Sequence, residues 1–399
     1  MRPFSRLGQE ILPSSTLAID TLYKSLKASG VDVIGFGAGE PDFDTPESVR
    51  EAGKRAIDEG LTRYTPVAGT GELRDAICGK LRRDYRLEYG VDQIVVSNGA
   101  KQSLFNALFA LLDPGDEVLI PSPYWISYPE MVRMCNGVPV FIETRGEGGF
   151  RLPLERLESL VTPRTKVLVL NSPGNPTGTV YTRGELSAVA EFVLRHDLHV
   201  LSDDIYEKLL YDGREFTSLA MLGEELRKRT VVINGVSKSH AMTGWRIGYS
   251  ASSRELAQIM VRVQSHMTSN SSSIGQAAAT EALRGSQDSV GQMRDAFQRR
   301  RDAMVRRIRA MPEVDCAVPE GAFYVMMDIR RLKGRTLDGQ RIASSDDLCS
   351  LLLRNARIAL VPGSGFGTDD HVRLSFATSE ENIERGMDRL EDCIRNSIR

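Results

Sequence analysis

The 399-residue sequence lacks a long apolar run and lacks a strong charge of either sign. No stretch of roughly 18 or more apolar residues occurs, so no segment is expected to span a bilayer. Lysine and arginine number 51 and aspartate and glutamate 53, which gives a formal net charge of -2. This balance produces no field that would draw the chain to nucleic acid or to an anionic membrane. We therefore expect neither nucleic acid nor membrane as a partner.

Cysteine and histidine are also scarce, with five of each. The cysteines form no CxxC pair and the histidines lack the spacing of metal ligands, so we expect no disulfide framework and no metal site. Reduced, scattered cysteines favour a cytoplasmic location. No apolar run follows residues 1–6, so a secretory signal is not expected. Arginine occurs in runs at 82–83, 299–301 and 306–307, and we interpret these runs as solvated helix faces.

The length exceeds what one compact core usually holds, so two domains are expected. In the middle of the chain, short apolar runs alternate with helical patterns, which indicates βαβ units and an α/β fold with a mainly parallel sheet. Ligands of such sheets bind beyond the carboxyl ends of the strands. The predicted strands are 93–97, 118–120, 138–142, 166–170, 198–201, 231–233 and 247–250, with helices at 101–112, 125–135 and 183–196.

The two ends of the chain have a different pattern. A helical stretch covers 17–28, and a long helical region leads from about 256 to Pro312. Strands and helices then alternate less strictly, as in an α+β unit. We predict a large domain of residues 46–285 and a smaller domain that combines residues 1–45 with 286–399.

The strongest chemical signal is Lys238, which lies just after an apolar strand in the segment Gly235-Val236-Ser237-Lys238. Lysine rarely ends a buried run. Burial lowers the pKa of an amine, which lets it act as a nucleophile toward an aldehyde. Arg246, eight residues later, is placed to hold an anion such as a phosphate. A strand-end lysine that extends to solvent is the alternative interpretation.

Three further motifs follow predicted strands. The small residues of 97–102 precede a helix, whose N-terminus offers free N–H groups to a phosphate. The loop 171–178 contains two prolines, two glycines and asparagines able to donate hydrogen bonds. Asp203 and Asp204 directly end a strand, where burial of their carboxylates is costly unless a cation meets them. Each motif alone is also compatible with an ordinary loop.

Together these motifs resemble the class I aminotransferases of pyridoxal phosphate (PLP) fold type I. Within that class, they are most similar to bacterial aspartate and aspartate/prephenate aminotransferases. The resemblance covers nearly the whole chain and implies a seven-stranded, mainly parallel sheet in the large domain. It includes the segments Pro13-Ser14, 37–43, 64–66, 122–125, 321–324 and 371–375.

The resemblance implies roles for the residues around the cofactor. Lys238 would bind PLP covalently and then move the proton of the substrate Cα, while Asp203 would pair with the ring nitrogen. Asn175 and Tyr206 would hydrogen-bond the 3′-oxygen of the ring, and Trp125 would stack on it. The phosphate would be held by Gly99, Ala100, Lys101 and Arg246, and by Tyr64 of a neighbouring subunit, which implies a homodimer with shared active sites.

For the amino acid and 2-oxo acid substrates, the resemblance implies that Arg373 holds the α-carboxylate in a bidentate pair. The backbone of Gly39 would close over the same group, with Trp125 and Asn175 beside it. Thr16 and Lys101 would lie near the distal carboxylate of an aspartate. Aspartate with 2-oxoglutarate is the favoured pair, although Leu12 stands where some relatives with dicarboxylic substrates have a basic residue. Aromatic, alanine, prephenate or specialised substrates stay open.

Four positions depart from the pattern of the family: Gly174, Asp204, Gly235 and His240. None removes a catalytic group, so we expect altered packing around the site rather than lost activity. A PLP-dependent β-lyase or a lyase similar to 1-aminocyclopropane-1-carboxylate synthase would share the same lysine chemistry and is the main alternative. An effector-binding module of a transcription factor is disfavoured, because we expect the fold to begin near residue 13 and the charge is near neutral.

Overall fold

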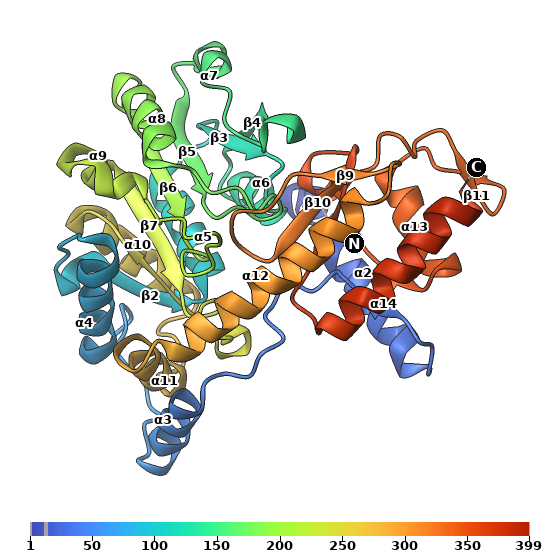
Figure 1. The fold of residues 1–399 in the computed structure, drawn as a ribbon. Coiled ribbons are helices and arrows are strands. Elements are labelled where there is room, and N and C mark those ends of the chain that lie inside the picture. The colour runs from blue at the N-terminus through green and yellow to red at the C-terminus, as the bar shows by residue number, and fades with distance from the viewer. Residues whose placement is uncertain (1, 12–14, 399) are drawn as a thin grey trace.

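The computed structural model describes residues 2–11 and 15–398, and the side chains of 15–20 lie outside that description (Figure 1). The larger sheet has seven strands, all parallel to their neighbours except β8, which is antiparallel to both of its partners. This topology confirms the predicted mainly parallel seven-stranded sheet. In spatial order the strands are β2 (Ile94–Asn98), β8 (Ile247–Ala251), β7 (Thr230–Gly235), β6 (His199–Asp203), β5 (Thr165–Asn171), β3 (Glu117–Ser122) and β4 (Val138–Glu143).

Helices cover both faces of this sheet because the central strands are apolar on both sides. In β2, Val95 points toward one core cluster while its neighbours Ile94 and Val96 belong to another. The first face packs against α5 (Ala100–Leu111), α6 (Ser127–Met134) and α10 (Arg254–Met267). The second face packs against α4 (Gly71–Lys80), α7 (Leu154–Leu160), α8 (Arg183–Arg195), α9 (Glu224–Arg229) and α11 (Ser273–Arg284). Helix α3 (Glu47–Asp58) packs on α11.

A smaller antiparallel sheet lies in the C-terminal part of the chain. Its strand order is β14 (Val361–Pro362), β15 (His371–Ser375), β10 (Tyr324–Asp328) and β9 (Asp315–Cys316). Around it lie α12 (Asp288–Arg309), α13 (Ser345–Asn355) and α14 (Glu380–Asp392). Two further C-terminal strands, β11 (Thr336–Leu337) and β12 (Gln340–Arg341), pair with each other.

The N-terminal segment joins this smaller unit. Strand β1 (Ile34–Gly35) pairs with β13 (Ile358–Ala359) in parallel register, and α2 (Ser15–Ala28) contacts β13 and β14. Helix α1 (Arg6–Glu10) precedes them. This arrangement supports the division into 46–285 and 1–45 with 286–399, which stays a prediction.

The predicted helical region from 256 to 312 is three helices rather than one. A Ser/Asn-rich turn at 268–272, with Ser269 at a φ of 61°, separates α10 from α11, and Gly285 follows α11. Of these three helices, only α12 belongs to the smaller unit. Figure 1 shows it running from the large sheet to the small one. The sequence pattern did not separate the helices because their apolar periodicity continues on either side of each turn.

The expectation that all arginine runs are solvated is wrong for two residues of α12. Arg300 and Arg301 are only 9% and 2% exposed. Arg301 donates to both carboxylate oxygens of Asp212 at 2.7 and 2.8 Å and to the carbonyl of Pro319 at 3.0 Å. Arg82, in contrast, lies at the surface in a bidentate pair with Glu88. Two buried arginines therefore fix α12 to its surroundings.

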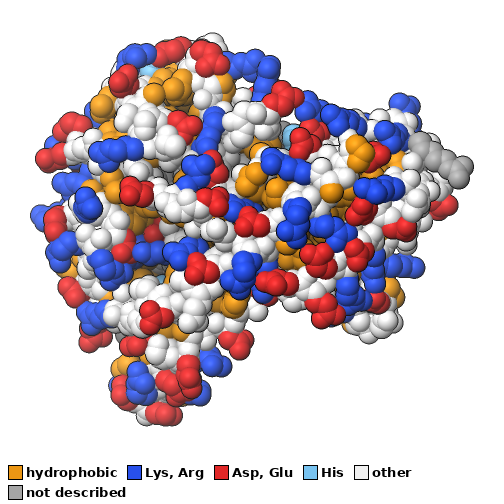
Figure 2. All heavy atoms as spheres, in the orientation of Figure 1, with side chains coloured by type: hydrophobic (Ala, Val, Ile, Leu, Met, Phe, Trp, Pro, Cys, Tyr) orange, Lys and Arg blue, Asp and Glu red, His pale blue; other side chains and the backbone are white. Residues whose placement is uncertain are grey.

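The surface carries both signs of charge in close mixture. Figure 2 shows basic and acidic side chains interspersed over the visible face, in line with the net charge of -2. No helix of the described part of the chain is long and apolar enough to cross a membrane.

Strand β8 approaches the N-terminus of α5 so closely that only glycine fits at Gly248. A Cβ atom there would lie 2.1 Å from the amide nitrogen of Ala100 and 2.4 Å from the carbonyl carbon of Gly99. Gly248→Ala should therefore destabilise the protein by about 1–3 kcal/mol, because the added methyl group forces the backbone apart. Urea denaturation measures the change.

The matched control is Gly244→Ala, where a Cβ atom meets nothing within 4 Å. This variant should stay within about 0.5 kcal/mol of the wild type, as surface substitutions usually do. Equal unfolding midpoints for the two variants would show that the close approach at Gly248 is not a constraint on stability.

Candidate active site

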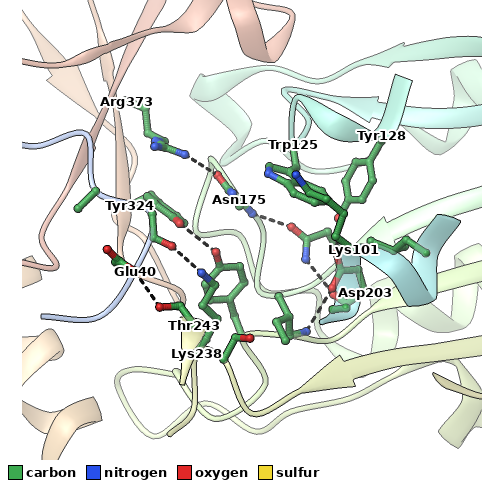
Figure 3. Close-up of a pocket in the computed structure, with 18 of the residues that line it drawn as sticks. Glu40, Lys101, Trp125, Tyr128, Asn175, Asp203, Lys238, Thr243, Tyr324 and Arg373 are labelled. Carbon is green, nitrogen blue, oxygen red and sulfur yellow. Dashed lines mark hydrogen bonds between the residues drawn. The ribbon is translucent and has the colours of Figure 1, made fainter. Parts of the chain in front are cut away.

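A cavity of about 410 Å³ opens where the carboxyl ends of β5, β6 and β7 face the smaller unit (Figure 3). Segments from both sheets line it, so the cavity lies between the two units. The structure brings together ten of the predicted residues in its lining: Gly39, Ala100, Lys101, Trp125, Asn175, Asp203, Tyr206, Lys238, Arg246 and Arg373.

Lys238 lies just beyond β7 and extends its amine into the cavity. Its Nζ donates a hydrogen bond to the carbonyl oxygen of Gly39 at 2.5 Å. Burial is the main cause that lowers the pKa of Lys238 to about 8; Arg246 and Arg373 lower it further, while Glu40 opposes the change. A substantial fraction of this amine is therefore neutral near physiological pH and available as a nucleophile.

Asp203 ends β6 and is buried at the floor of the cavity. Its carboxylate accepts a hydrogen bond from the hydroxyl of Tyr128 at 2.6 Å and forms no ion pair with any residue that the structure describes. Burial raises the pKa of Asp203 to about 6. A buried carboxylate of this kind is stabilised by a cationic group placed beside it, such as a protonated ring nitrogen.

The turn before α5 forms an anion-binding corner. Gly99 has a φ of 80°, which glycine adopts without strain, and the amides of the first turn of α5 point outward. Arg246 covers this turn: its Nη2 donates to the carbonyl of Asn98 at 3.2 Å and its Nη1 to that of Thr243 at 2.9 Å. Free amides beside an exposed guanidinium fit a phosphate group.

Lys101 lies in the first turn of α5, with its Nζ 4.8 Å from the centre of the Trp125 ring. Burial, with a smaller contribution from Arg246, lowers the pKa of Lys101. Trp125 itself packs edge-on against Tyr128 at 5.3 Å between ring centres. This wall of the cavity is therefore aromatic and carries a second amine.

Arg373, on β15, is 3% exposed and lies at the opposite end of the cavity. Its Nη1 donates to Oδ1 of Asn175 and its Nη2 to the carbonyl of Gly37, each at 3.1 Å. Its Nε is buried without a hydrogen-bond partner among the described residues. A buried guanidinium that keeps one N–H donor unpaired can bind a carboxylate.

Two predicted residues lie elsewhere. Tyr64 is 91% exposed and does not line the cavity of its own chain. Thr16 lies in α2, but its side chain is outside the described residues, as are Leu12, Pro13 and Ser14. The structure therefore neither supports nor contradicts a substrate contact from Thr16. Gly99 is not part of the cavity lining, but a Cβ atom at this position would lie 2.4 Å from Nη2 of Arg246.

Sequence reasoning missed Tyr128 and Tyr324. Tyr128 holds Asp203, while the Tyr324 hydroxyl lies 2.9 Å from that of Tyr206 and its ring centre 4.4 Å from the Arg373 guanidinium. The available signals were weak. Tyr128 stands three residues after Trp125, and Tyr324 begins the strand that pairs with the strand of Arg373.

The departures from the family pattern have local explanations. A Cβ atom at Gly235 would lie 2.9 Å from the carbonyl oxygen of Ile247, so the close approach of β7 and β8 favours glycine there. Asp204 is buried and accepts a hydrogen bond from the Ser202 hydroxyl at 2.7 Å. Burial raises the pKa of Asp204 to about 8. A Cβ atom at Gly174 would meet Oγ1 of Thr177 at 2.7 Å, and His240 is buried beside Ser239.

Comparison with known proteins gives matches over the full chain. The family described as "Aminotransferase class I and II" matches residues 31–390. The aspartate aminotransferase of Bacillus sp. (strain YM-2) is 45% identical over 385 residues, which cover 96% of this chain and 97% of the relative. The aspartate/prephenate aminotransferase of Cereibacter sphaeroides is 48% identical over 383 residues and 96% of each chain.

Solved structures agree with these relatives. The aspartate aminotransferase from Rhizobium meliloti has a TM-score of 0.95 at 46% identity and covers 100% of both chains. The aspartate aminotransferase from Thermus thermophilus with maleate has a TM-score of 0.93 at 43% identity, over 98% of this chain and 100% of that one.

A lysine of lowered pKa between a buried carboxylate and a buried guanidinium suits chemistry on amines and carbonyl groups, so fold and site define an enzyme of that class. The matches then fix the family. The chain belongs to the class I and II aminotransferases and is an aminotransferase. This family uses PLP, and the predicted fold type is confirmed.

The lowered pKa of Lys238 predicts how fast the cofactor-free protein takes up an aldehyde such as PLP. Only the neutral amine attacks the aldehyde, so the rate should rise with pH and level off above a midpoint near 8. An unperturbed lysine would give a midpoint about two pH units higher. Stopped-flow absorbance over pH 6.5 to 10 measures the rate.

Trapping with borohydride and peptide mass spectrometry shows whether the label is on Lys238. The variant Lys238→Arg is the control, because it keeps the positive charge and removes the nucleophile. A midpoint near 10, or equal labelling of the variant, would contradict the assignment.

Proposed function

We propose that this aminotransferase moves the amino group of L-aspartate to 2-oxoglutarate, with PLP bound to Lys238. The observation that carries the proposal is the position of the Lys238 amine between Asp203 at the cavity floor and Arg373 at its far end. This order along the cavity suits a PLP ring whose cationic nitrogen faces Asp203 and an amino acid whose carboxylate faces Arg373.

PLP, when bound, supplies an electron-accepting ring that stabilises negative charge at the Cα of the amino acid. The residues of the chain do the rest. Asp203, held by Tyr128, keeps a positive charge on the ring nitrogen favourable. Gly99, Ala100 and Arg246 receive the phosphate at the N-terminus of α5.

Other residues hold the ring and the substrate. Tyr206 and Asn175 would donate hydrogen bonds to the ring oxygen, and Trp125 would cover a face of the ring. Arg373 would bind the α-carboxylate and fix the Cα–H bond in one direction. The Lys238 amine would accept the Cα proton and return it at the carbon that carried the aldehyde group of PLP. Donor and acceptor use the same site in turn, so ping-pong kinetics follow.

The preference for a dicarboxylate is supported by the charges around the cavity. Five cationic side chains line it, against the two carboxylates of Glu40 and Asp203. Arg246 and Arg373 are taken by a phosphate and an α-carboxylate in this proposal, and Lys238 by the cofactor. Lys24 and Lys101 remain, and Lys101, in the first turn of α5, is the one that we assign to the distal carboxylate. The contact from Thr16 stays an expectation from the family resemblance. The relatives from Bacillus sp. and Cereibacter sphaeroides are aspartate and aspartate/prephenate aminotransferases, which supports this preference.

We also infer a homodimer with shared active sites. Tyr64, at 91% exposure, is a large aromatic residue that the cavity of its own chain does not use. In the proposed dimer it contacts the phosphate bound by the partner subunit.

The five cysteines are buried and unpaired, which supports a reducing, cytoplasmic location.

The absorption spectrum tests the central claim. Purified protein supplied with PLP should show a band in the near-ultraviolet to visible range, and L-aspartate or L-glutamate alone should convert it to that of the amino form of the cofactor. Lys238→Ala should abolish catalytic turnover, because the proton carrier is lost. If an amino acid with a leaving group at Cβ, such as L-cysteine, is instead converted to pyruvate and ammonia without any oxo acid, the lyase alternative replaces the aminotransferase assignment for that amino acid.

The role of Lys101 is tested by Lys101→Met, which keeps most of the side-chain volume and removes the charge. The KM for L-aspartate should rise at least about tenfold, because one charge-assisted contact to the distal carboxylate is lost. The KM for L-alanine, which has no distal carboxylate, should change less than about threefold. Equal changes for both amino acids would assign Lys101 to the phosphate instead.

A further inference from the structure

Two of the groups closest to the reacting amine and carboxylate belong to one short segment of backbone, residues 37–45, which we call the strap. The carbonyl of Gly37 accepts a hydrogen bond from Arg373 at 3.1 Å, and the carbonyl of Gly39 accepts one from Lys238 at 2.5 Å. The strap therefore touches both the lysine and the arginine on which the proposed function rests. Its position decides where these two side chains point.

The strap contains only loop and turn backbone, so side-chain contacts must hold it. Glu40 accepts a hydrogen bond from the Thr243 hydroxyl at 2.7 Å, next to the anion-binding corner. The hydroxyl of Thr45 donates to the carbonyl of Ala241 at 2.7 Å. Both of these contacts lie at the surface or are only half-buried, and both tie the strap to the large sheet.

A third contact joins the strap to α12 through a charged pair. Asp42 receives Nη1 of Arg300 at 2.7 Å, and the Arg300 side chain is 11% exposed. The guanidinium carbon lies 4.9 Å from the ring centre of Phe43 and 5.7 Å from that of Phe297. The two rings pack edge to face at 5.4 Å. The strap is thus fixed to α12 by an ion pair whose guanidinium packs against two aromatic rings, while the Asp42 side chain is 28% exposed.

Burial of the guanidinium distinguishes this pair from one in which both partners are solvated. The Arg300 guanidinium gains from contact with the rings and with the carboxylate, and removal of Asp42 leaves this buried charge without its partner. Arg301, the next residue, fixes α12 to Asp212 of the large unit. These two arginines, adjacent on α12, therefore connect the helix to the strap and to the large unit, respectively.

We propose that Arg300 is a positioning residue of this aminotransferase, which through Asp42 holds the strap so that Gly37 and Gly39 orient Arg373 and Lys238. Arg300 touches neither the cofactor nor the substrate. Loss of Arg300 leaves Lys238 and Arg373 present but frees the strap, whose carbonyl groups orient both side chains. Binding of the substrate carboxylate suffers first, because Arg373 then samples several orientations. The proposal rests on the proposed roles of Lys238 and Arg373.

The test compares Arg300→Met with Arg299→Met, a control on the same helix whose side chain is 67% exposed. With maleate as the probe, the dissociation constant of the PLP-loaded Arg300→Met protein should rise about tenfold, and the KM for L-aspartate should rise similarly, while kcat stays within about threefold. Arg300→Lys should recover part of the loss, because lysine restores the charge but not the flat contact with the rings. The control should match the wild type.

A second readout needs no ligand. Cleavage of the cofactor-free protein before Asp44 by endoproteinase Asp-N should be about fivefold faster in Arg300→Met, because a released strap opens locally more often. Asp42→Asn should have the same effects on maleate binding and on cleavage. The double variant should add little to either single variant, since both break one pair. Thermal unfolding midpoints confirm that each variant is folded.

The outcomes separate the two proposals. Unchanged maleate binding and cleavage in Arg300→Met, equal effects in Arg299→Met, or fully additive effects in the double variant would each overturn the positioning role. If Arg300→Met does not fold, Asp42→Asn decides, because Asp42 lies at the surface. If the wild type itself does not bind maleate, the dicarboxylate preference fails, and the cleavage rates alone decide the role of Arg300.

Discussion

The buried carboxylate of Asp203 is the constraint on which the rest of the site depends. A carboxylate at the end of an apolar strand is costly unless a positive charge meets it. Among the described residues, its hydrogen-bond donors are the Tyr128 hydroxyl and the backbone amide of Ile205. The pKa of Asp203, raised to about 6, records that deficit. The fold thus maintains an uncompensated acceptor at the floor of its cavity. In the proposed function, a cofactor with a cationic ring nitrogen would remove this deficit, so binding energy and electronic activation of the ring would come from the same contact.

The second constraint is that the reacting groups come from both sheets. Lys238 and Asp203 lie at the carboxyl ends of parallel strands, whereas Arg373 lies on the antiparallel sheet. Neither sheet alone can bind an amino acid by its carboxylate and hold the nucleophile against its Cα. The relative position of the two units therefore belongs to the catalytic geometry. Helix α12, with its adjacent buried arginines, and the strap are the elements that connect these units next to the cavity.

Sequence patterns predicted most of the large sheet and its site because those features are local. An apolar run followed at once by Asp203, or by Lys238 three residues after its last strand residue, is visible within ten positions. Tyr128 and Tyr324 were missed because their partners, Asp203 and Tyr206, are 75 and 118 positions away. Arg300 was assigned to a solvated face because it stands in a run of arginines with acidic residues interspersed, whereas its partner Asp42 is 258 positions distant. Burial of a charged side chain is decided by such partners, which periodicity does not contain.

The positive charge of the cavity connects chemistry with specificity. Arg246 and Arg373 contribute, after burial, to the lowered pKa of Lys238, so the groups suited to bind anions also help to keep the nucleophile neutral. An anionic ligand that neutralises either arginine removes part of that effect, and the Lys238 amine then holds a proton more readily. In the proposed function, binding of a carboxylate at Arg373 would therefore favour the lysine as a proton acceptor when the Cα proton must leave. Carboxylate recognition and proton transfer would thus be coupled through charge across the cavity, and a neutral residue in place of Arg373 would weaken carboxylate binding and remove this coupling.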